Sequence, residues 1–98
     1  MNMQNLMIQA KKMQRDLEKA QKELEEKEYI GKSQLVNVTL NGKGRIISMD
    51  INMNDISADD KEILEDMVIV AVNDAIEKME KEKEEKFGKY GQMVNGLF

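Results

Sequence analysis

Charged side chains are the main candidates for chemistry in this chain, because its 98 residues include no histidine and no cysteine. Their absence removes the usual general base, a common metal ligand and any thiol nucleophile. Two carboxylate pairs, Asp59-Asp60 and Glu65-Asp66, have the residue types for cation binding or acid–base work. Neither pair lies beside a glycine-rich loop or a nucleophile, so helix capping explains the first and surface charge the second. We therefore expect no enzyme, no metal site and no cofactor.

A second pattern involves cations, which are concentrated near the N-terminus. Residues 1–22 carry five basic and two acidic side chains, a net charge of +3, whereas residues 50–77 carry nine acids and one lysine, a net charge of −8. In a helix, the five cations share the face opposite an apolar seam; they are Lys11, Lys12, Arg15, Lys19 and Lys22. We call them the basic row. Such a row suits DNA phosphates, since each neutralised phosphate releases a counterion, but a charged face also keeps a long helix soluble.

The first third of the chain predicts the helix that carries this row. Residues 2–28 contain no glycine or proline, and apolar residues recur at alternating spacings of three and four, as in a coiled-coil seam. The seam residues are Met3, Leu6, Ala10, Met13, Leu17, Ala20 and Leu24. A seam this narrow cannot bury itself, so the helix must lie along another helix, from the same chain or from a second copy.

The middle of the chain changes to a period of two, which predicts antiparallel strands. Apolar and polar residues alternate over 36–41 and again over 47–53. Between them, Asn41-Gly42 predicts a hairpin with a type I′ turn, which needs positive φ angles. Tyr29 to Lys32 is expected to add a third strand at the edge of the sheet.

A second helix is predicted from Ser57, where a hydroxyl and the acids that follow it suit a helix N-terminus. Its centre, Met67 to Val72, is the longest all-apolar run and is expected to be buried. The run is far shorter than the roughly 20 residues that cross a bilayer. We expect this helix to end by Gly88, followed by a mobile tail over 89–98. With no charged leader before an apolar segment, a cytoplasmic protein is expected.

Together these elements predict one α+β domain over residues 1–88, in the order α-β-β-β-α, with two long helices flanking a small antiparallel sheet. The apolar band of the second helix is wider than one helix and one sheet face can cover. That excess predicts a homodimer, in which a second copy covers the remainder. The residues assigned to the dimer interface are Val36, Val38, Val68, Ile69, Val70 and Val72.

Several short motifs occur in the order and at the distances found in a known family. Residues 35–44 read LVNVTLNGKG, residues 64–68 read LEDMV and residues 71–75 read AVNDA, after a first helix rich in Met and Gln. Over nearly its whole length the chain resembles the bacterial YbaB/EbfC family of nucleoid-associated proteins. This resemblance implies an α-β-β-β-α subunit and a tweezer-shaped homodimer joined through its sheets. It also implies DNA binding by projecting helical arms with limited sequence preference.

From the resemblance we expect a nucleoid-located protein with a role in nucleoid organisation and gene regulation, whose basic row contacts double-stranded DNA. Lys83, Lys86 and Lys89 are added as further phosphate contacts, ranked below the basic row because ion pairs with nearby glutamates also explain them. No membrane and no small-molecule substrate is expected.

Two other classes stay open. A prefoldin-like chaperone grips unfolded chains with apolar helix tips, and Met3, Met7 and Ile8 supply such a tip here. An adaptor for another protein is the second alternative.

Overall fold

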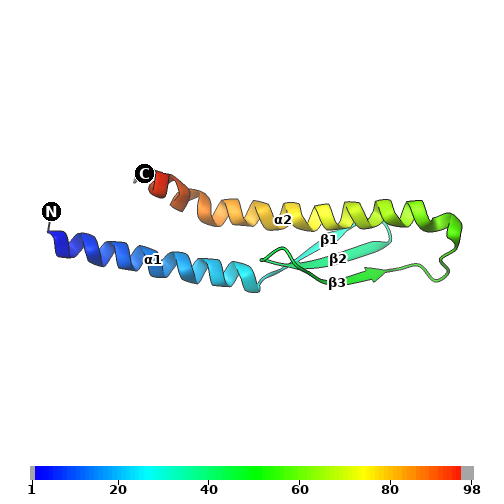
Figure 1. The fold of residues 1–98 in the computed structure, drawn as a ribbon, viewed down its shortest axis with the longest axis horizontal. Helices are drawn as coiled ribbons and strands as arrows, with labels where there is room; N and C mark the ends of the chain where they lie inside the picture. The colour runs from blue at the N-terminus through cyan, green and yellow to red at the C-terminus, as the bar shows by residue number, and fades with distance from the viewer. Residues whose placement is uncertain (1, 96–98) are drawn as a thin grey trace.

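The subunit is elongated, and its two long helices project together beyond one end of a small sheet (Figure 1). This computed structural model describes the backbone of residues 2–95 and the side chains of residues 2–88. The subunit measures 70 × 21 × 14 Å. Along the chain the elements are α1 (Met3–Glu26), β1 (Glu28–Lys32), β2 (Val36–Asn41), β3 (Ile46–Ile51), the 3₁₀ turn η1 (Ala58–Asp60) and α2 (Lys61–Asn95). The predicted α+β class and α-β-β-β-α order are confirmed.

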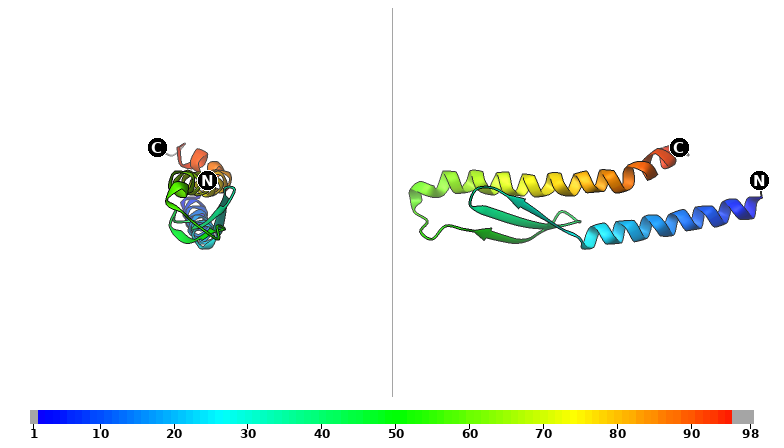
Figure 2. Two further views of the ribbon diagram at one scale, coloured as in Figure 1. Left: turned by 90° about the vertical axis from the view of Figure 1, so that its right-hand side faces the viewer. Right: turned by 180° about the vertical axis from the view of Figure 1, so that it is seen from behind.

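The core lies between α2 and the sheet, whose antiparallel strands follow the order β1-β2-β3. Val36, Val38 and Leu40 point from the central strand to one face and are at most 1% exposed. They pack on Ala71 and Ala75 of α2. The end-on view in Figure 2 shows α2 on one side of the sheet, where it packs mainly on β1 and β2.

A glycine lets α2 approach the sheet closely. A Cβ atom at Gly31 of β1 would lie 1.9 Å from the carbonyl oxygen of Ala71 and 2.5 Å from the amide nitrogen of Ala75. The backbones of β1 and α2 are therefore in direct contact, which requires glycine on the strand and favours alanine on the helix.

The predicted hairpin between β2 and β3 is confirmed, but its predicted turn type is wrong. Gly44 has a φ of 80°, and it is the one described residue with a positive φ, so Gly42 does not have the type I′ geometry. The Gly44 N–H instead donates to the Asn41 carbonyl (3.0 Å), and the Asn41 side chain accepts from the N–H groups of Lys43 (2.9 Å) and Arg45 (3.1 Å). The loop is thus one residue longer and reverses at Gly44.

The predicted start of the second helix is confirmed, whereas its predicted end is wrong. The Asp60 carboxylate accepts from the Ser57 N–H (3.0 Å) and hydroxyl (3.2 Å), and η1 leads directly into α2. At the other end α2 continues through Gly88 to Asn95, because Gly88 does not adopt the positive φ with which glycine ends a helix. Residues 96–98 and the side chains from residue 89 onward lie outside the described part, so the mobile tail stays a prediction.

The centre of α2 is less buried within one subunit than the sequence predicts. Ile69 and Val70 are 56% and 54% exposed, because the sheet covers one side of the helix. The expectation of a buried centre is therefore wrong for these two residues in the single chain, whereas Ala71 is 0% exposed and Met67, Val68 and Val72 pack against the core. Over the described residues, neither helix combines the length and apolar character that crossing a membrane requires.

Candidate functional site

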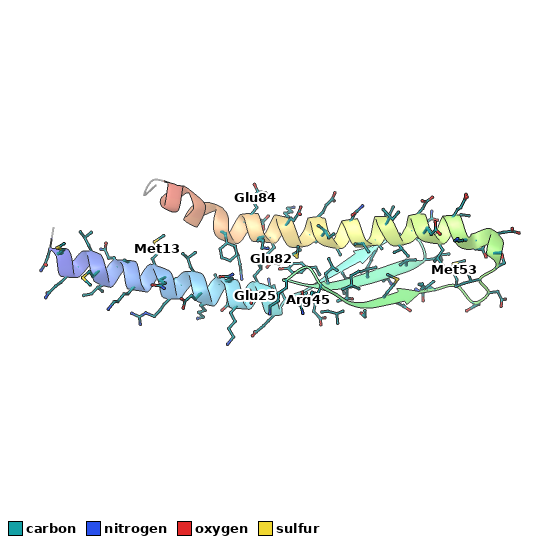
Figure 3. All side chains as sticks on the ribbon, in the orientation of Figure 1. Met13, Glu25, Arg45, Met53, Glu82 and Glu84 are labelled. Carbon is teal, nitrogen blue, oxygen red and sulfur yellow. The ribbon has the colours of Figure 1, made fainter. Side chains whose placement is uncertain are left out.

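The basic row lies along the solvent side of α1, and all five of its side chains are exposed. The opposite side of the helix carries Leu24, which is 1% exposed and anchors the seam. This separation follows from the helical period of 3.6 residues, and it places five cations within about 17 Å along the axis. Figure 3 shows the N-terminal part of α1 reaching past α2, with side chains that project into solvent. The row is accessible to a long anionic partner.

The basic row forms no ion pair with another side chain that the structure describes. Among the side chains that the structure describes, the ion pairs are Lys27–Glu82, Lys61–Glu65, Lys78–Asp74 and Lys86–Glu23. None of these pairs includes a member of the row. Lysine and arginine side chains that already extend into water and form no internal ion pair give up few favourable contacts when they bind phosphate.

The three lysines assigned to α2 are placed differently from one another. Lys86 lies 3.6 Å from Glu23 and so links α2 to α1. Lys83 is exposed and lines a cleft of about 680 Å³ together with Lys43 of the hairpin and Phe87. The side chain of Lys89 lies outside the described residues. The structure therefore does not bring Lys83 or Lys86 onto the face of α1 that carries the basic row.

A compact junction fixes α1 to the body of the subunit at its C-terminal end. Leu24, Tyr29 and Met79 form a buried cluster against which Phe87 packs. Beside it, Lys27 forms an ion pair with Glu82, which Figure 3 places between the two helices. We call these residues the arm junction. The sequence gives no signal for it, since the junction joins residues 24–29 to residues 79–87, which are far apart in the chain.

The pKa values at the arm junction follow from these contacts. The hydrogen bond from Lys27, and then the contact with Tyr29, holds the pKa of Glu82 below its ordinary value of 4.5. Burial, followed by the neighbouring Glu82 carboxylate, raises the pKa of Tyr29 above its ordinary value of 10.0. The junction therefore favours an ionised glutamate beside a neutral tyrosine.

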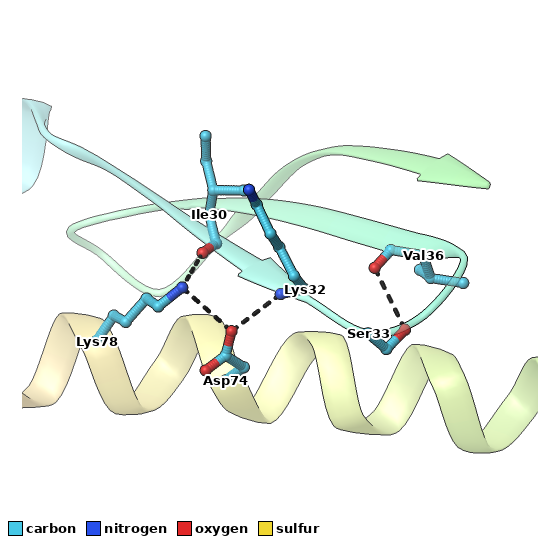
Figure 4. Close-up of polar contacts among 6 residues, drawn as sticks. All are labelled: Ile30, Lys32, Ser33, Val36, Asp74 and Lys78. Carbon is cyan, nitrogen blue, oxygen red and sulfur yellow. Dashed lines mark hydrogen bonds and ion pairs between the residues drawn. The ribbon is translucent and has the colours of Figure 1, made fainter. Parts of the chain in front are cut away.

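Side chains of α2 close the outer edge of β1, as Figure 4 shows. The Lys78 ammonium donates to the carbonyl of Ile30 (2.8 Å), and the backbone N–H of Lys32 donates to the Asp74 carboxylate (2.9 Å). Lys78 and Asp74 are themselves 3.2 Å apart. The bond from Lys32, then that from Lys78, lowers the pKa of Asp74. Because these groups already have partners, this edge is poorly suited to pair with another strand.

The opposite edge of the sheet is open and apolar. Ile46 (53% exposed), Ile47 (51%) and Met49 (41%) lie on β3, which is the strand farthest from α2 in Figure 1. On α2, Val72 and Ile76 pack against the core, as does Ile51 of β3. Ile69 lies on the same side of the helix as these two residues, because it precedes them by three and by seven positions. We call the surface formed by Ile46, Ile47, Met49 and Ile69 the open flank.

The residues assigned to the dimer interface do not lie on one surface. Val36 and Val38 are 0% exposed in the core, and Val68 and Val72 are partly buried against it. Ile69 belongs to the open flank. Val70 lies on the other side of α2, where it lines a cleft with Lys32 and Asp74 near the closed edge of β1.

Comparison with known proteins identifies this architecture. A model of the YbaB/EbfC DNA-binding family matches residues 1–94. The chain belongs to this family. A nucleoid-associated protein of Enterococcus faecalis is 43% identical over 98 residues, which cover 98% of this chain and 94% of the relative. Nucleoid-associated proteins from two strains of Streptococcus pneumoniae, Hungary19A-6 and CGSP14, are each 39% identical over 92 residues, or 92% of this chain and 93% of the relative.

The YbaB/EbfC family is a DNA-binding family and not a family of enzymes. In this member, Asp60 of the first carboxylate pair is used as a helix cap. Glu65 of the second pair lies 4.0 Å from Lys61, one turn earlier on α2. Among the described residues, no group of three or more acidic side chains is placed to hold a metal ion. One member of each pair, Asp60 and Glu65, thus has a structural contact.

Proposed function

We propose that this protein is a nucleoid-associated protein that binds duplex DNA as a homodimer, through the basic row of α1 and with little sequence preference. The observation that carries the proposal is the row itself, which is exposed on a projecting helix and has no internal ion pair among the described side chains. Contacts to phosphate position a protein on DNA without reading its sequence. The proposal includes low sequence specificity and a location in the nucleoid. It also includes roles in nucleoid organisation and in gene regulation.

The charge distribution supports contact through α1 in particular. Each chain has a net charge of −4, so a dimer carries −8, and residues 50–77 alone account for nine acids. These residues form the end of the subunit away from the projecting part of α1 (Figure 1). Binding through α1 keeps the acidic end away from the phosphates, and the interaction should weaken steeply as salt rises.

Dimerisation through the open flank is supported by the difference between the two sheet edges. The edge of β1 is closed by Lys78 and Asp74, whereas β3 has exposed apolar side chains and an outer edge with no strand beside it in the subunit. A second copy is the natural partner, because an isologous contact matches the same apolar patch on both subunits. Such a dimer leaves both α1 helices free to project.

The test is a titration of labelled random-sequence duplexes with the wild-type protein and with the triple variant Lys11→Ala, Lys12→Ala, Arg15→Ala. The variant should bind all duplexes more weakly by a similar factor. The slope of log affinity against log salt should become shallower by about one for each phosphate that is no longer neutralised. Lys61→Ala, near the acidic end, is the control and should bind like wild type. An unchanged affinity of the triple variant would contradict the assignment of the basic row.

A prefoldin-like chaperone is the second candidate, favoured by the exposure of Met3 (78%), Met7 (58%) and Ile8 (62%) at the end of α1. The same titration separates the two functions when an unfolded polypeptide is added as a competing ligand. Capture of that polypeptide without saturable duplex binding would favour the chaperone.

A further inference from the structure

The first turns of α1 carry no charged side chain and expose several apolar ones. Residues 2–10 contain no charged side chain, although 35% of the whole chain is charged. Four large apolar side chains are exposed in this segment: Met3 (78%), Leu6 (47%), Met7 (58%) and Ile8 (62%). We call residues 2–10 the arm tip. With no charged side chain of its own, the arm tip is distinct in chemistry from the basic row.

The described part of α2 does not cover the arm tip. The pairs Glu23–Lys86 and Lys27–Glu82 set the antiparallel register of the two helices. Extended along both helices, this register places Asn95, the last described residue of α2, level with Gln14. Figures 1 and 2 show the N-terminal end of α1 reaching past α2. Accordingly, Leu24 near one end of the seam is buried, whereas Leu6 near the other end is exposed.

The pattern of the arm tip identifies the kind of partner that fits it. Met3, Leu6 and Ala10 continue the alternating spacing of the seam, which suits a second helix with the same spacing. An arm tip from another copy has that spacing, and it brings no like charge to oppose the contact. Methionine side chains adapt readily to such a neighbour. We propose that arm tips of separate DNA-binding units pair with each other, helix against helix, and so join one unit to another.

The direction of α1 determines how two arm tips overlap. The N-terminus of α1 points away from the sheet (Figure 1), so two arms that meet tip to tip run antiparallel. The exposed seam extends from Met3 to Ala10, and its centre is next to Leu6. In a symmetric overlap, Leu6 therefore lies close to Leu6 of the partner subunit.

A contact made by so few side chains is weak between free molecules. Binding to DNA raises the local concentration of the units, which strengthens weak contacts without adding new ones. Paired arm tips would then link two duplexes, each held by the basic row of one unit. The pairing itself does not depend on DNA, so it is measurable in the absence of DNA.

Neighbouring positions on α1 give a matched pair of variants. Leu6→Glu places a charge within the seam, whereas Ile8→Glu places the same charge about 200° around the helix. Both residues are exposed, and unchanged thermal unfolding by circular dichroism will verify that each variant is folded. Sedimentation velocity measures assembly over a range of protein concentrations that reaches millimolar. We call the species present in dilute solution the smallest assembly. The wild type and Ile8→Glu should form larger species as the concentration rises, and Leu6→Glu should not. Absence of larger wild-type species, or equal loss in both variants, would overturn the proposal.

Site-directed crosslinking tests the predicted geometry, because the chain has no cysteine of its own. Mild oxidation of Leu6→Cys should give a covalent product whose native mass is twice that of the smallest assembly, and Ile8→Cys should give at least tenfold less. Crosslinks confined to the smallest assembly would overturn pairing between units.

A bridging experiment distinguishes this proposal from the proposed DNA binding. Beads carrying one duplex should retain a second, labelled duplex in the presence of wild-type protein. Leu6→Glu should lose this retention while binding a single duplex as tightly as Ile8→Glu, which carries the same added charge and should keep the retention, and the triple variant of the basic row should lose both. If wild-type protein self-associates through the tips but binds no duplex, only the DNA-binding proposal fails. If Leu6→Glu abolishes capture of unfolded polypeptide while self-association is absent, the tip is a chaperone surface and the pairing proposal is wrong.

Discussion

At the scale of single residues, glycine positions determine how closely the helices and the sheet approach. Gly31 leaves no room for a Cβ atom beneath Ala71, and Gly42 would place one 1.8 Å from the carbonyl oxygen of Leu24. Gly88, in contrast, has open space around its Cβ position inside α2. The same residue type is therefore required at two positions by packing and is merely tolerated at the third.

This contrast predicts opposite effects of one substitution. Gly31→Ala should lower the free energy of unfolding by about 3 kcal/mol, because the added methyl meets backbone atoms that cannot move independently. Gly88→Ala should raise it by up to about 1 kcal/mol, since alanine is the better helix former. Urea unfolding followed by circular dichroism measures both. Similar stability of Gly31→Ala and wild type would show that α2 and β1 are not in direct backbone contact.

A second prediction at this scale concerns acid. The pKa values of Asp74 and Glu82 are below the ordinary values of 3.8 and 4.5 in the folded state. A carboxylate with a lowered folded pKa stabilises the fold above its unfolded pKa, and this stabilisation is lost as pH falls through the folded value. Stability should therefore decrease below about pH 4.5. The measurement is urea unfolding between pH 7 and pH 2.

Asp74→Asn and Glu82→Gln serve as the matched variants for this experiment. Each should be less stable than wild type at pH 7 and should lose less stability on acidification, because the substituted group no longer titrates. A variant whose pH dependence matches that of wild type would show that its carboxylate does not contribute.

At the scale of elements, α1 is held at one end. Leu24 is 1% exposed in the arm junction, whereas Leu6 is 47% exposed in the arm tip. Leu24→Ala should destabilise the subunit by about 3 kcal/mol, since it leaves a cavity among packed side chains. Leu6→Ala should change the stability of the dilute protein by less than about 0.5 kcal/mol. Thermal unfolding at low protein concentration compares the two, and equal effects would mean that the arm tip is also packed within the subunit.

The sequence predicts elements well where the pattern is local. The period of two gives β2 and β3, the capping residues give the start of α2, and the seam gives α1. It fails where a contact between distant residues decides the outcome. The hairpin, for example, packs against the end of α1 at Gly42, a contact that the local Asn-Gly pattern does not reveal. Periodicity also does not show which side of α2 the sheet covers, so it does not separate Ile69, on the side toward β3, from Val70, about 100° around the helix on the side toward β1.

At the scale of the whole molecule, the basic row and the open flank lie at different places along the long axis. The basic row and the arm tip are on the projecting part of α1, and the open flank is on the body with the sheet. The closed edge of β1 leaves β3 as the edge available to a second copy. Binding of DNA and assembly can therefore use different surfaces, so each can be removed by substitution without the other.

Adjacent residues of α2 offer the sharpest test of the dimer. Ile69 and Val70 are almost equally exposed, at 56% and 54%, but only Ile69 belongs to the open flank. Ile69→Glu should convert the protein from a dimer to a single chain at micromolar concentration, because the charge would be buried without a partner in the interface. Val70→Glu should remain dimeric. Light scattering coupled to size-exclusion chromatography gives both masses. A dimeric Ile69→Glu with a monomeric Val70→Glu would place the interface on the β1 side, and a monomeric wild type would exclude the dimer altogether.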